Sequence, residues 1–248
     1  MPSALRLGLL LAALALGGCA HTPADDPSDP LEGFNRGVFK FNMTADKYVL
    51  RPVAKGYDKV MPGFARTGVS NFFSNLLYPT VMVNDLLQLK FKQFGSDTCR
   101  FVMNTLIGWG GLFDVATKAG LPAHDEDFGQ TLGYWGVGQG WYLMLPFMGP
   151  ATNRDLVGKV GDWPTSPMTY ISEQHWDYGL GANVLQVVDG RAAFLDADAM
   201  LEQQIDKYVF VRSIYLQDRL GKVHDGNPPK EDFGFDDEEE EKEEAPKE

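Results

Sequence analysis

The sequence predicts an all-α fold in a single domain. Apolar residues recur at the three- and four-residue spacing of helices in one segment after another. Prolines and glycines separate these segments, and no series of strand, turn and strand appears. With 248 residues, of which 44% are hydrophobic, the chain is long enough for one substantial core. No repeat and no second domain boundary divides it.

The first helix has the clearest start signal. Asp29 is expected to be its N-cap, Pro30 its first residue, and Glu32 the partner that closes a capping box. Apolar residues then follow at helical spacing until Pro52, which is expected to end the helix. Further helices, several of them cut by prolines, are predicted over residues 53–61, 64–78, 80–94, 96–107, 113–119, 153–161, 184–188, 191–205 and 208–220.

Residues 128–150 interrupt the helical pattern. They contain many glycines and aromatic residues, with neither a helical period nor the alternation of a strand. We therefore expect an irregular apolar segment with close backbone approaches.

The two ends of the chain are predicted to lie outside the fold. Residues 1–18 combine a basic start, an apolar run and small residues, which is typical of a removed export signal. Cys19 follows directly and looks like the acylated cysteine of bacterial lipoproteins, the alternative being an ordinary signal with an incidental cysteine. Residues 19–28 form a polar tether, 29–224 the helical domain, and 225–248 a disordered acidic tail.

Charge excludes one large class of function. The net charge of −12 and the pI of about 4.7 make nucleic-acid binding improbable, because that activity needs a basic face. The tail carries 12 acidic and 3 basic residues, a net of −9, so the remaining 224 residues carry only −12 − (−9) = −3.

The search for catalytic or cofactor chemistry finds no site. His124 lies beside Asp125, Glu126 and Asp127, and we interpret these four residues as a solvated loop and not as a metal-binding site. The glycines at 136, 138 and 140 lack the spacing of a dinucleotide fingerprint. Cys99 is expected to be a small buried core residue. We expect no enzyme, no metal and no cofactor.

Aromatic residues make up 12% of the chain, and several helices have few polar faces. Such residues either fill a core or meet acyl chains and the membrane boundary. Composition alone does not separate these readings.

A set of ordered motifs, spread over residues 29–220, resembles the MlaA family of lipoproteins, also called VacJ. The motifs are Asp29-Pro-Leu-Glu-Gly-Phe-Asn-Arg36, Arg51-Pro-Val53, Val69-Ser-Asn-Phe72, Pro79-Thr-Val-Met-Val-Asn84, Arg100-Phe-Val-Met-Asn-Thr105, Gly110-Gly-Leu-Phe-Asp114, Phe128-Gly-Gln-Thr-Leu-Gly133, Gly136-Val-Gly-Gln-Gly140, Leu145-Pro-Phe147 and Tyr208.

The resemblance implies a single helical ring around an amphipathic channel, embedded in the inner leaflet of the outer membrane. It implies removal of misplaced phospholipids from the outer leaflet, with a trimeric porin and a periplasmic lipid carrier as partners. Ala20, where an Asp would mark retention in the inner membrane, agrees with an outer-membrane location. The alternative is a structural lipoprotein that stabilises a porin and moves no lipid.

The resemblance leaves the channel residues open, and two groups are candidates. The first group is expected in the channel wall or the ring seam, although Asn35 and Arg36 are equally suited to buried structural hydrogen bonds. The second is expected at the channel rim or membrane boundary, with ring packing as the alternative. The first group is Phe34, Asn35, Arg36, Phe39, Phe41 and Asn42, and the second is Trp135, Gly138, Trp141 and Tyr142.

Overall fold

The computed structural model describes residues 28–229, and nearly all of its elements are helical. The first half contains α2 (Glu32–Ala45), the π-helix η1 (Asp46–Leu50), α3 (Arg51–Val60), α4 (Gly63–Leu87), α5 (Phe91–Leu106), α6 (Val115–Lys118) and α7 (Phe128–Tyr134). The second half contains β1 (Tyr142–Leu145), β2 (Gly149–Thr152), α8 (Asn153–Asp162), the 3-10 helix η2 (Trp163–Thr165), α9 (Pro167–Gln174), α10 (Trp176–Ala193), α11 (Asp198–Glu202) and α12 (Lys207–Val223). The all-α prediction is confirmed; residues 1–18, Cys19, nearly all of the tether and most of the acidic tail lie outside the described residues.

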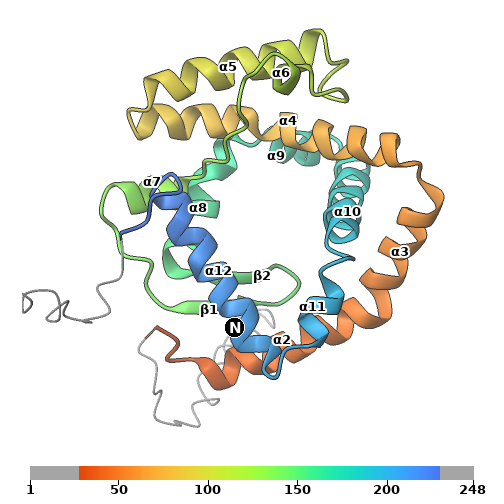
Figure 1. The fold of residues 1–248 in the computed structure, drawn as a ribbon, viewed down its shortest axis with the longest axis vertical. Helices are drawn as coiled ribbons and strands as arrows, with labels where there is room; N and C mark the ends of the chain where they lie inside the picture. Colours follow the sequence, from red (N-terminus) through yellow and green to blue (C-terminus); the bar gives the residue numbers. More distant parts are fainter. Residues whose placement is uncertain (1–27, 230–248) are drawn as a thin grey trace, which may run out of the picture.

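The elements form a ring around a central opening (Figure 1). Helix α4 crosses one side of the ring, and α5 packs along its outer flank. Helix α10 contacts α3, α4 and α9, while α8 contacts α7 and β2. Contacts of α2 with β1 and of α12 with β2 and α7 close the ring.

The closing seam brings the start of the described chain against its last helix. Asp29 is fully buried and accepts hydrogen bonds from Asn35 Nδ2 (2.8 Å), from Arg212 Nη1 (2.9 Å) and from the Tyr208 hydroxyl. Tyr142 and Tyr208 form a small core beside this carboxylate. The expected capping box is therefore wrong: α2 begins at Glu32 without a side-chain cap, because the Asp29 carboxylate is occupied at the seam.

Two prolines do not end helices as the sequence predicted. Pro52 lies at the start of α3, which continues without a break from η1, so the helix runs through this proline at the point where it changes from π to α geometry. Pro79 lies inside the long helix α4. Residues on several faces of α4 are buried, so tertiary packing holds the helix together where one backbone hydrogen bond is missing.

The glycine-rich stretch is more regular than expected, since it contains α7 and a β-hairpin. Strands β1 and β2 are antiparallel, with Tyr142 opposite Thr152 and Leu145 opposite Gly149. The free edge of β1 bonds to asparagines of α2: Met144 N donates to Asn35 Oδ1 (2.9 Å), and Asn42 Nδ2 donates to Leu145 O (2.8 Å). Side chains of a helix take the place of a third strand.

Polar and apolar residues are distributed unusually. Among the described residues, buried polar and charged side chains outnumber buried hydrophobic ones, while many large apolar side chains are exposed. Phe64 (81% exposed), Trp109 (77%) and Trp176 (74%) are examples. Cys99 is exposed too, so the expectation of a buried core cysteine is wrong. In the part of the chain that the structure describes, no helix combines the length and the apolar character needed to cross a membrane.

Replacing Asn35 with alanine tests the seam. The variant leaves Met144 N and Tyr142 O of β1, and Asp29, each without its buried partner. We expect the free energy of unfolding to fall by roughly 2–4 kcal/mol, because buried polar groups lose their hydrogen bonds. Urea unfolding in detergent, followed by circular dichroism, measures this. Asn153→Ala is the control, since Asn153 is exposed; equal stability of the two variants would contradict the assignment.

Candidate functional site: an amphipathic cavity inside the ring

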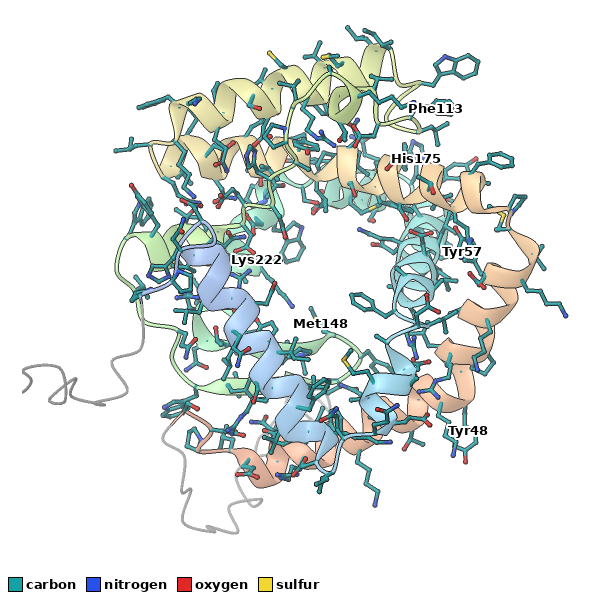
Figure 2. All side chains as sticks on the ribbon, in the orientation of Figure 1. Tyr48, Tyr57, Phe113, Met148, His175 and Lys222 are labelled. Atoms are coloured by element: carbon teal, nitrogen blue, oxygen red, sulfur yellow. The ribbon has the colours of Figure 1, made fainter. Side chains whose placement is uncertain are left out.

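Residues of α4, α8, α9 and α10, with the hairpin turn, line a cavity of about 720 Å³ that is open to solvent and that we call the central cavity. Met148, on the hairpin turn, lies at the edge of the opening (Figure 2). The lining residues are Phe73, Leu76, Leu77, Met148, Lys159, Trp163, Ser166, Met168, Thr169, Ser172, Glu173, Asn183 and Gln186.

A second cavity of about 330 Å³, the acidic side cavity, adjoins the first. The two share Leu77, Lys159, Trp163, Ser166 and Thr169 as lining residues. Its other lining residues include four carboxylates, namely Asp125, Glu126, Asp127 and Asp162. The interior of the ring thus continues from a mixed space into an acidic one.

The central cavity is amphipathic. Aromatic, leucine and methionine side chains supply apolar wall, and hydroxyls, amides and two charged groups supply polar wall. Such a space receives both the apolar and the polar part of an amphiphile, because a charged group placed in purely apolar surroundings costs several kcal/mol.

The wall around Lys159 depends on close contact between α7 and α8. A Cβ atom at Gly158 would collide with the backbone nitrogen of Gly129, so the helices approach at two glycines. Asp162 then accepts hydrogen bonds from Asn84 Nδ2 (2.9 Å) and from Phe128 N (3.1 Å). These bonds attach the end of α8 to α4 and to α7.

The loop before α7 is part of the buried network, and the expectation of a solvated loop is wrong. His124 Nδ1 contacts Asp97 Oδ1 at 2.9 Å, and buried Glu126 accepts from Lys90 Nζ (2.9 Å). Asp127 caps α7. No cluster of metal-ligand side chains suited to an ion occurs among residues 28–229.

Arg219 of α12 connects this loop to α8. Its guanidinium donates to both oxygens of Asp127 (2.6 and 2.9 Å) and to Asp155 Oδ1 (2.7 Å). Burial alone would raise the pKa of Asp127, but the bonds from Arg219 outweigh it and hold that pKa below its usual value. The carboxylate of Asp127 is therefore charged, and the bonds from Arg219 hold α12 against α7 and α8.

Asp85 and Asp97 form a different kind of contact. Both side chains are fully buried, and neither oxygen of Asp85 has a hydrogen-bond donor in the described structure. Burial, followed by the charges of Asp97 and Glu126, raises the pKa of Asp85 to about 7. We infer that the pair holds a proton, which lets one carboxyl donate to the other.

The structure places the first group of candidate residues in the seam and beside the hairpin. Asn35 and Asn42 bond to β1, and Arg36 bonds to Asp206 (2.8 Å). Phe39 packs against the seam core. Phe34 and Phe41 line an apolar groove of about 450 Å³ together with Phe147. None of the six is among the residues that line the central cavity.

The second group of candidate residues is divided between exposed and buried positions. Trp135, Gly138 and Trp141 are exposed, and Trp135 Nε1 donates to Leu87 O (3.1 Å). Tyr142 is fully buried in the seam core, which removes it from any rim, because its ring packs between Tyr208 and Tyr215.

Sequence reasoning missed the residues that line the cavity. Lys159, Glu173 and Gln186 come from three different helices after the hairpin, α8, α9 and α10, and no motif marks them. The one usable signal was the spacing of Gly158 and Gly161 beside Lys159, which indicates a helix packed closely on a neighbour.

The ring and its cavity define a class of helical protein with an apolar exterior and an interior suited to an amphiphile. A family model described as "MlaA lipoprotein" matches residues 27–222. The chain is 41% identical over 220 residues to the "Intermembrane phospholipid transport system lipoprotein MlaA" of Escherichia coli (strain K12), covering 84% of this chain and 86% of the relative. The chain therefore belongs to the MlaA lipoprotein family.

Two further comparisons agree. The protein of the same name from Haemophilus influenzae is 35% identical over 236 residues, covering 89% of this chain and 90% of the relative. A solved structure, described as "Structural basis for maintenance of bacterial outer membrane lipid asymmetry", matches with a TM-score of 0.71 at 41% identity, covering 81% of this chain and 100% of that one. The resemblance expected from the motifs is confirmed.

Replacing Asp85 with asparagine tests the carboxyl pair. The pKa of Asp85 rises from 3.8 to about 7 on folding, so the cost of burying its charge is absent below pH 4 and destabilises the fold increasingly as pH rises towards 7. We expect Asp85→Asn to match the parent protein near pH 4 and to be more stable at pH 8 by on the order of 2–4 kcal/mol.

The measurement is the free energy of unfolding in detergent across this pH range. Asp196→Asn, at an exposed position, is the control and should follow the parent protein at every pH. A difference between Asp85→Asn and the parent that is independent of pH would argue against a shared proton.

Proposed function

We propose that this protein removes misplaced phospholipids from the outer leaflet of the outer membrane and so maintains lipid asymmetry. The lipid passes through the central cavity and is handed to a periplasmic lipid carrier for return to the inner membrane. The observation that carries the proposal is the amphipathic cavity inside a ring whose outer surface is rich in exposed apolar side chains. No covalent bond of the lipid changes.

The location follows from the same features. We propose that acyl chains on Cys19 anchor the protein in the periplasmic leaflet, with the apolar exterior of the ring among lipid tails. Seated there, the ring separates the cavity from lipids of its own leaflet. Only lipids that descend from the opposite leaflet then reach the polar wall that their head groups need.

A trimeric porin is the proposed partner within the membrane. The exposed aromatic residues outside the ring, such as Trp109 and Phe113, suit contacts with lipid or with the outer wall of a barrel. The alternative of a porin stabiliser that moves no lipid draws no support from the relatives, whose names describe phospholipid transport.

Surface exposure of phospholipid is the direct test of function. Cells that lack the protein are expected to expose more phospholipid on their surface, and a Cys19→Ala variant is expected to do the same because the ring loses its anchor. Mass spectrometry of the mature N-terminal peptide checks the acylation of Cys19. Unchanged surface phospholipid in both strains would count against transport.

Filling the cavity separates transport from porin binding. Gln186 lines the central cavity, so Gln186→Trp should block it and raise surface phospholipid to the level of the deletion. Gln203→Trp, at an exposed position outside the cavity lining, is the matched control and should behave as the parent protein. Both variants should still co-purify with porin; normal asymmetry in Gln186→Trp would favour the porin stabiliser.

A further inference from the structure

Among the described residues, the charged groups that line the two cavities are ion-paired or hydrogen-bonded, with two exceptions. In the acidic side cavity, Asp125 pairs with Lys222 (2.7 Å), Glu126 with Lys90 (2.9 Å) and Asp127 with Arg219 (2.6 Å). Asp162 is held by the hydrogen bonds from Asn84 and Phe128 already described. These carboxylates are therefore neutralised or bonded by the protein itself.

Lys159 and Glu173 are the exceptions. Lys159 lies on α8 and lines both cavities; Glu173 lies on α9 and lines the central cavity. Both residues are exposed, and for neither does the described structure show a side-chain hydrogen bond or an ion pair. One free ammonium and one free carboxylate thus face the same space without neutralising each other.

We propose that Lys159 and Glu173 select phospholipids with a zwitterionic head group that bears an ammonium, the phosphatidylethanolamine class, over purely anionic ones. This inference rests on the proposed function. Such a head group joins a phosphate and an ammonium by a short linker, so it supplies one charge of each sign. Its phosphate is the partner of Lys159 and its ammonium the partner of Glu173, with each contact a charge-assisted hydrogen bond.

A purely anionic lipid, such as phosphatidylglycerol, satisfies only half of this arrangement. Its phosphate meets Lys159, but Glu173 stays unpaired and repels the negative charge. Because both side chains are exposed to solvent, each contact is weak, and we expect a preference of about fivefold.

The test measures which lipid the full-length protein retains. The purified protein is incubated with vesicles of equal parts phosphatidylethanolamine and phosphatidylglycerol, re-isolated, and its lipids are quantified by mass spectrometry. The parent protein should be enriched in phosphatidylethanolamine about fivefold. Glu173→Lys places two cations in the cavity and should reverse the preference towards phosphatidylglycerol.

The exchange of the two charges is the decisive variant. Lys159→Glu alone leaves two carboxylates and no partner for the phosphate, so it should lower total lipid retention while keeping the preference for phosphatidylethanolamine. Lys159→Glu combined with Glu173→Lys should restore both the retention and the preference that Glu173→Lys alone reverses, because the head group can bind in the opposite orientation. A merely structural role of either residue does not predict this rescue. Lys55→Glu, on the exposed face of α3, is the matched control and should leave the ratio unchanged.

The outcomes distinguish this inference from the proposed function. An identical lipid ratio in all variants, or a double variant without rescue, overturns head-group selection and leaves transport intact. If no lipid is retained by any protein, including the parent, then the proposed function and the head-group selection both fail.

Discussion

The buried carboxylate of Asp29 is the interaction on which the ring depends. It accepts hydrogen bonds from α2 through Asn35 and from α12 through Tyr208 and Arg212, so it joins the first described helix to the last. A ring with an open centre has no continuous apolar core to draw its ends together. Directional bonds at one seam replace that core, and the same asparagine holds the edge of the hairpin whose turn borders the cavity.

The polar interior also follows from the lack of a continuous apolar core. When large apolar side chains are on the outside, the contacts between helices have to come from hydrogen bonds and ion pairs, and each buried group then needs a partner. Arg219 illustrates this rule, since a single guanidinium holds Asp127 and Asp155 and thereby fixes α7 and α8 relative to α12. The wall of the cavity is positioned by this network, which leaves the side chains of Lys159 and Glu173 free for a ligand.

The helical class could be predicted from periodicity, because periodicity reports local packing, whereas the ring was expected only from the family resemblance and from no local pattern. The sequence pattern indicates that Asp29 is an N-cap, yet two of its three partners, Tyr208 and Arg212, lie more than a hundred residues away on α12. The hairpin was missed because its third partner is a pair of asparagine side chains, which leave no alternating pattern. The cavity residues were missed for a similar reason: Lys159 resembles any exposed lysine until the ring brings α8 and α9 to one space.

The exposed apolar exterior also bears on how such a protein reaches its destination. Phe64, Trp109 and Trp176 present a surface that water does not tolerate in large patches, and copies of the chain meeting in solution would adhere through it. A folded ring that diffuses freely through water would therefore associate with other copies of itself. A folded copy in water therefore stays separate from others only while another molecule, such as an escort protein or a membrane lipid, covers this surface.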